Sequence, residues 1–173
     1  QFLHQATERS IVEQGEILPK PPYYLGHYAL IVILSKLSFI PVELLDRIFL
    51  PLFAGIFLPL ILLWSMKLTI AQIPSAADSA DAKLPTTYYL LPTFLFLALP
   101  FSSFIVTTPQ GLANFFFVAT LLTSLQIVAR SASAVLFLGD FFIPTIFSLA
   151  AISIHPIAGI PAIIFVLALW SIS

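Results

Sequence analysis

Long apolar runs dominate this sequence and restrict what it can fold into. A helix needs about 20 apolar residues to cross the hydrocarbon core of a bilayer, and several runs come near that length: 23–39, 44–66, 88–106, 111–128, 132–154 and 157–172. Only 9% of the residues are charged, against about 25% in soluble domains, so a soluble fold could not cover this apolar surface. The sequence therefore predicts an all-α, multi-pass integral membrane protein of the cell membrane, with the lipid bilayer as its solvent.

The chain is predicted to form a single transmembrane domain over residues 1–173. Residues 1–20 have mixed polarity and favour a short helix lying at the membrane interface, and residues 22–173 form a bundle of about six spans. The sequence starts with Gln1, its only methionine is Met66, and an apolar run is still in progress at its end. We therefore interpret it as a piece of a longer protein.

Histidines stand out against the apolar background. His155 precedes Pro156, and this spacing favours a junction where Pro156 starts the next helix and His155 lies at the water interface; ligand binding is the alternative. His27 lies one turn into the first run, so it either bonds a neighbouring carbonyl or faces a ligand cavity. His4 lies in the interfacial helix, and Glu8, four residues later, shares its face.

Charged and hydroxyl residues mark the expected helix ends. Asp140 is favoured as the N-cap of a helix that starts near Phe141, and the alternative is an ionisable site within the membrane. Asp46 lies just inside the second run, where it reaches the interface or pairs elsewhere. Thr107 or Thr108 is expected to cap the helix that follows.

Composition and motifs exclude several classes of function. The chain has no cysteine, so neither a disulfide framework nor a thiolate metal site can form. A net charge of −1 gives no reason to expect a nucleic-acid partner. The sequence contains no glycine-rich phosphate loop and no HExxH or GxSxG motif. Motifs alone therefore identify no enzyme.

Four stretches, taken in order, resemble the membrane-embedded GT-C glycosyltransferases, which include protein O-mannosyltransferases and the catalytic subunits of oligosaccharyltransferases. FLHQATERSIVEQGEILP resembles the end of their first extracellular loop, and PPYYLGHYALIVILSKLSFI resembles the entry to their second helix. LPFSSFIVTTPQGLANFFFVATLL resembles the turn that opens a later helix, and SLAAISIHPIAGIPAIIF resembles a helix junction that contains His-Pro.

The resemblance implies a multi-span enzyme whose donor is a polyprenyl-phosphate-linked sugar, with the acceptor undetermined and the first helix missing from this sequence. In the family a loop carboxylate acts as general base or as a metal ligand, so a divalent metal ion is a candidate cofactor. Here that carboxylate would lie upstream of Gln1. His4, His27 and His155 match histidines of the family and are expected to bind substrate. Glu8 joins them only through its spacing from His4.

Two other functions fit the same polar residues. They would line the substrate path of a transporter or permease module, although the absence of an internal repeat disfavours this function. Alternatively, they only cap helices in a non-catalytic membrane subunit. The orientation also has two solutions, since the family places residues 1–20 outside the cytoplasm, whereas the distribution of Lys and Arg predicts the reverse.

Overall fold

A computed structural model describes residues 2–18, 22–70, 107–130 and 138–172. Within these ranges all regular structure is helical and no strand occurs, which confirms the all-α prediction. The predicted span 88–106 lies outside the described residues. The α-helices are α1 (Phe2–Gln14), α2 (Leu25–Ser38), α3 (Val42–Ile70), α6 (Pro109–Arg130), α7 (Phe142–Ile154) and α8 (Pro156–Ile172); the 3-10 turns η1 (Pro22–Tyr24) and η3 (Leu138–Phe141) precede α2 and α7.

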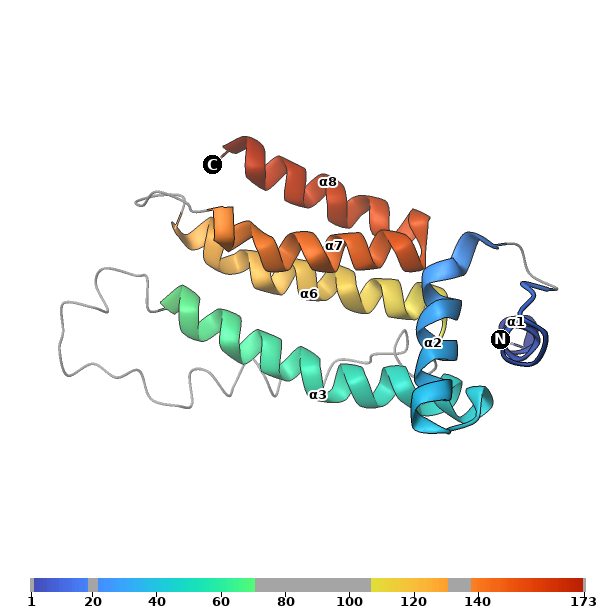
Figure 1. The fold of residues 1–173 in the computed structure, drawn as a ribbon. Helices are drawn as coiled ribbons and strands as arrows, with labels where there is room; N and C mark the ends of the chain where they lie inside the picture. The colour runs from blue at the N-terminus through green and yellow to red at the C-terminus, as the bar shows by residue number, and fades with distance from the viewer. Residues whose placement is uncertain (1, 19–21, 71–106, 131–137, 173) are drawn as a thin grey trace.

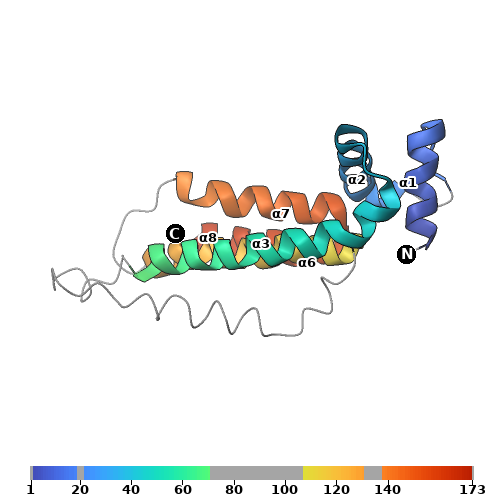
Figure 2. The same ribbon diagram turned by 90° about the horizontal axis from the view of Figure 1, so that it is seen from below.

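The longer helices form the body of the fold. α3, α6, α7 and α8 lie side by side, while α1 and α2 lie across one end (Figures 1 and 2). α6 is central, since it packs against α3, α7 and α8. Its buried Leu112 and Phe115 join Leu50 and Leu58 of α3 in the main apolar core. The starts of α3 and α6 and the junction of α7 with α8 all lie at the end that α1 and α2 cover (Figure 1).

α3 is the helix with the length and composition of a membrane span. Its segment Val42–Lys67 has 26 residues, and only 28% of its most apolar window is buried within the protein. Among the residues that the structure describes, it is the one helix that is long and apolar enough to cross a bilayer, in agreement with the predicted run 44–66. The other apolar helices recognised there are shorter: Leu25–Ser38, Gly139–Ile154 and Pro156–Ser171.

α2 differs from its prediction as the first span, 23–39. Its 14 residues extend about 21 Å at 1.5 Å per residue, which is less than the roughly 30 Å of a hydrocarbon core. The helix also lies across the end of the bundle and not along it (Figure 1). An apolar run of this length is compatible with a membrane span and with a shorter helix across the end of the bundle. Composition alone therefore could not distinguish the two arrangements.

Two glycines permit close approach of helices at this end. A Cβ on Gly26 of α2 would overlap the backbone carbonyl of Ser153 in α7, and a Cβ on Gly159 of α8 would overlap the backbone of Ile152 in α7. Only glycine allows backbones to come this near. The two contacts hold α2 and α8 against the last turns of α7, close to His155 in the sequence.

The polar N-terminal segment is helical, as predicted, and docks through its polar face. α1 ends before Gly15, whose φ of 76° is the left-handed conformation that commonly terminates helices. The face turned inward carries Thr7 and Glu8, which are fully buried. On the outside, Arg9 pairs with Glu43 at the start of α3. The helix is thus held by polar contacts as well as by apolar ones.

The helix starts predicted from the sequence are partly correct. The Gly111 N–H donates to Thr108 Oγ1 at 3.0 Å, so Thr108 caps α6 as expected. Asp140 is not the N-cap of α7, because it lies within η3 and Phe141 takes that position without a side-chain cap bond. A 3-10 turn at the helix entry displaces the expected cap by one residue.

Thr107 joins the start of α6 to α3. α3 contains Pro51, which has no N–H to contribute to the helical hydrogen bonds. One residue earlier, the Leu50 N–H donates to Thr107 Oγ1 at 2.9 Å. The Thr107 N–H in turn donates to the Asp46 carbonyl at 2.9 Å. This exchange fixes the turn of α3 that carries Asp46.

Thr107→Val is expected to destabilise the protein by about 1–3 kcal/mol, because it leaves the buried Leu50 N–H without its acceptor. Thr107→Ser is the matched control, since it keeps the hydroxyl and loses a methyl group worth about 1 kcal/mol. Unfolding by denaturing detergent, starting from the protein in mild detergent micelles, measures both variants. A valine variant as stable as the serine variant would contradict the role of this hydroxyl.

Candidate functional site

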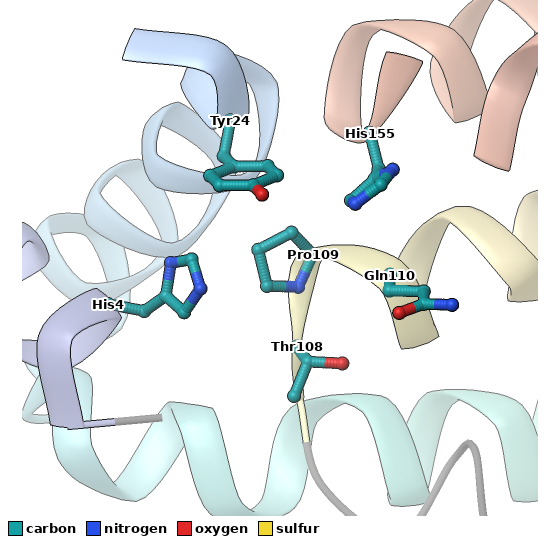
Figure 3. Close-up of a pocket in the computed structure, with 6 residues that line it drawn as sticks. All are labelled: His4, Tyr24, Thr108, Pro109, Gln110 and His155. Carbon is teal, nitrogen blue, oxygen red and sulfur yellow. The ribbon is translucent and has the colours of Figure 1, made fainter. Parts of the chain in front are cut away.

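A polar pocket opens at the end of the bundle that α1 and α2 cover. It has a volume of about 230 Å³ and is lined by His4, Tyr24, Thr108, Pro109, Gln110 and His155. Figure 3 shows the rings of His4, Tyr24 and His155 grouped around Pro109, the first residue of α6. The pocket is therefore built from segments that are far apart in the sequence: α1, η1, the start of α6 and the α7–α8 junction.

Aromatic contacts fix the rings on one side of the pocket. The centroids of the His4 and Tyr24 rings are 5.2 Å apart, as are those of the Tyr24 and His155 rings. His4 Nδ1 lies 2.9 Å from the Tyr28 hydroxyl, and Tyr28 is fully buried. The half-buried His4 ring is thus oriented by a hydrogen bond to a buried side chain.

His155 connects two helices and lines the pocket. α7 ends at Ile154, His155 is extended with φ −148° and ψ 100°, and α8 begins at Pro156, which confirms the predicted junction. The Ala158 N–H donates to His155 Nδ1 at 3.2 Å, as expected for an N-cap side chain and the third helical residue. The structural role predicted for His155 is therefore present, and the same ring also faces the pocket.

These two roles of His155 can be separated by mutation. His155→Ala removes the cap and is expected to cost about 1 kcal/mol of stability. His155→Asn keeps an acceptor at the N-cap, so it should retain most of the stability while removing the imidazole from the pocket. Thermal unfolding in detergent compares the two variants. Equal loss of stability in both would show that the side chain does not cap α8.

A second polar group lies next to the pocket and is closed to solvent. Glu8 of α1, His27 of α2 and Asp46 of α3 are all fully buried. His27 Nε2 and Glu8 Oε1 are 3.0 Å apart, and one donor atom from each of the three residues lies within 4.8 Å of the other two. The His27 ring centroid is 6.3 Å from that of His4. We call these three residues the buried triad.

The buried triad is poor in hydrogen bonds. Within the described part of the chain, no hydrogen bond of ordinary geometry reaches the carboxylate oxygens of Glu8 and Asp46 or the ring nitrogens of His27. Burial raises the pKa of Glu8 to about 8, the carboxylate of Glu43 acts in the same direction, and a contact with Asp46 opposes the shift. Two carboxylates and one imidazole can hold a shared proton or a divalent cation.

Stability should depend on pH through Glu8. Folded Glu8 keeps its proton up to about pH 8, whereas the ordinary pKa is 4.5, so the folded state binds more protons between these values. In the presence of a chelator, the free energy of unfolding is therefore expected to fall as the pH rises from about 5 to about 8. Glu8→Gln mimics the protonated form and should flatten this slope. Equal slopes for the variant and the wild type would contradict the prediction.

The structure brings together the residues that the sequence indicates. His4, Glu8 and His27 lie where α1 meets α2, and His155 lies across the pocket from His4. Asp46, predicted to reach the interface or pair elsewhere, is fully buried, and its carboxylate lies near Glu8 and His27. Its position one turn into a long apolar helix is the signal that identifies it as unusual.

Comparison with protein-family models, with curated proteins and with solved structures finds no significant match for this chain. The functional assignment therefore depends on the pocket, the buried triad and the resemblance of the four sequence stretches.

Proposed function

We propose that this protein is the membrane-embedded core of a GT-C-like glycosyltransferase, which transfers a sugar from a polyprenyl-phosphate donor to an acceptor. The observation that carries the proposal is the convergence of three histidines at one end of the bundle. His4, His27 and His155 belong to three separate stretches that resemble the family. The described helices bring His4 and His155 to one pocket and His27 to the cluster beside it.

The proposed reaction exchanges one bond at the anomeric carbon of the sugar. The nucleophilic atom of the acceptor bonds to that carbon, the bond from the carbon to the phosphate oxygen breaks, and polyprenyl phosphate leaves with the bonding electrons. A general base takes the acceptor proton, and the resemblance to the family makes a carboxylate the candidate. The role assigned to this pocket is to bind and orient the sugar phosphate.

The pocket has features suited to a phosphate next to a sugar. α6 begins at the pocket with Pro109, and the start of a helix carries partial positive charge that favours anions. His4 and His155 offer ring nitrogens on two sides, and Gln110 offers an amide. This combination supports an anionic, hydroxyl-rich ligand over an apolar one.

The proposal includes a multi-pass position in the membrane. α6 has 22 residues and extends about 33 Å, and α3, α7 and α8 all pack along it (Figure 1). The outer faces of α7 and α8 carry exposed apolar side chains: Phe142, Ile146, Leu149, Ile164 and Leu167. With these helices in the bilayer, the pocket lies at one membrane surface. A lipid-linked donor presents its phosphate and sugar at that depth.

A transfer assay tests the proposal. The intact protein, purified in detergent, is incubated with a panel of labelled polyprenyl-phosphate sugars and with an extract of the source cells as acceptor. We expect one donor to be consumed, with release of polyprenyl phosphate and label in the acceptor. If no donor is consumed and the reconstituted protein moves a polar solute into vesicles, the protein is a transporter. If neither occurs, it is a non-catalytic subunit.

A further inference from the structure

We infer that Glu8, His27 and Asp46 form a binding site for a divalent transition-metal cation, with zinc as the preferred ion. The site ties α1 to α2 and α3 beside the pocket. It rests on three fully buried side chains from three helices, whose donor atoms lie within 4.8 Å of one another. The inference goes beyond the proposed sugar transfer and does not depend on it.

The donors of the buried triad lack the partners that a purely structural cluster would have. Among the described residues, no hydrogen bond of ordinary geometry reaches the carboxylates of Glu8 and Asp46 or the His27 ring. The approach of His27 Nε2 to Glu8 Oε1, at 3.0 Å, involves one oxygen of one carboxylate. Buried polar atoms are almost always satisfied, because their desolvation is costly. A cation accepts lone pairs from all three residues at once.

Charge and geometry favour a divalent ion. Two ionised carboxylates and a neutral imidazole carry a charge of −2, which a divalent cation neutralises in this buried site. A tetrahedral zinc ion with bonds of about 2.0–2.2 Å sets neighbouring donors about 3.3 Å apart. The separation of 3.0 Å between His27 Nε2 and Glu8 Oε1 is already close to that value.

The mixed donor set selects the type of ion. Imidazole favours zinc and other transition metals, whereas magnesium and calcium prefer sites made of oxygen alone. Three protein ligands leave a fourth position for water or for a group of a bound substrate. The competing explanation is a proton shared by the two carboxyl groups, with no metal at all.

Metal content distinguishes these two explanations. The intact protein is stripped with EDTA in detergent, dialysed against zinc, manganese, magnesium or calcium at equal concentration, and analysed by elemental mass spectrometry. We expect about one zinc per chain and a rise in melting temperature on zinc addition. Asp46→Asn and His27→Asn should bind zinc at least tenfold more weakly. Glu13→Gln, in an exposed position of α1, the helix that carries Glu8, is the control and should bind zinc like the wild type.

Three results would overturn the inference. They are no zinc uptake by the wild type, equal uptake by Asp46→Asn, or uptake of magnesium or calcium with no transition metal. If the asparagine variants fail to fold, X-ray absorption of the zinc-loaded wild type decides, since we expect one imidazole in a shell otherwise made of oxygen. A shell with two or more imidazoles would contradict the assignment. Because these readouts require no sugar transfer, a failed transfer assay leaves their outcome unaffected.

Discussion

Gly26→Ala is expected to lower the free energy of unfolding by about 2–3 kcal/mol, at the upper end of the usual cost of overpacking. The added methyl group would overlap the carbonyl of Ser153, and a backbone carbonyl inside a helix cannot rotate away as a side chain can. Relief requires α2 to move off α7. That movement would displace Tyr24 and His27, so substrate and metal binding should weaken together with stability.

Gly55→Ala is the matched control for this substitution. A Cβ at Gly55 of α3 meets nothing within 4 Å, and alanine is a better helix former than glycine by about 1 kcal/mol. This variant should therefore equal or exceed the wild type in stability. Helical circular dichroism during unfolding in detergent compares the two variants. A Gly26→Ala protein as stable as Gly55→Ala would contradict the close packing of α2 on α7.

His4→Ala is expected to reduce sugar transfer by about 100-fold, which is the loss that a misplaced substrate can cause. The imidazole lines the pocket and is oriented by the hydroxyl of Tyr28 at 2.9 Å. Tyr28→Phe removes only that hydroxyl, so the His4 ring stays in the pocket but loses this hydrogen-bond partner. We expect Tyr28→Phe to retain more activity than His4→Ala, with a loss on the order of tenfold.

Measuring both the stability and the kcat of His4→Ala distinguishes a role of His4 in the site from damage to the fold. His4 is half-buried, so His4→Ala should unfold within a few degrees of the wild type while its kcat falls. Glu13→Gln, at an exposed position nine residues after His4 in α1, should leave transfer unchanged. Full transfer by His4→Ala would remove His4 from the site.

Local rules predict the parts of this fold that depend on neighbouring residues. The junction at His155 and Pro156 follows from the lack of an N–H in proline, which suits the first position of a helix. The cap at Thr108 follows from the preference of short hydroxyl side chains for orphan N–H groups. The long run of α3 follows from hydropathy alone. Each of these signals lies within a few residues of the feature that it predicts.

The buried triad depends on tertiary contacts and could be predicted only in part. The spacing of His4 and Glu8 indicates a shared helix face, but nothing in the sequence shows that this face meets α2 and α3. From the sequence alone, Asp46 is expected to lie at the membrane interface. Only the packing of α3 against α1 shows that it is buried. The direction of α2 also depends on a tertiary contact. Gly26 has no side chain, which lets α2 cross close to α7, and hydropathy carries no information on this crossing.

Photo-crosslinking of a polyprenyl phosphate would test the central claim, that the pocket binds a lipid-linked sugar, most directly. A diazirine next to the phosphate is activated in the presence of the intact membrane-embedded protein, and labelled peptides are identified by mass spectrometry. We predict labels at His4, Tyr24 and Thr108–Gln110, which line the pocket, and their loss when unlabelled donor competes. Labels confined to the outer faces of α3, α7 or α8, or labels that do not respond to competitor, would contradict the proposed function.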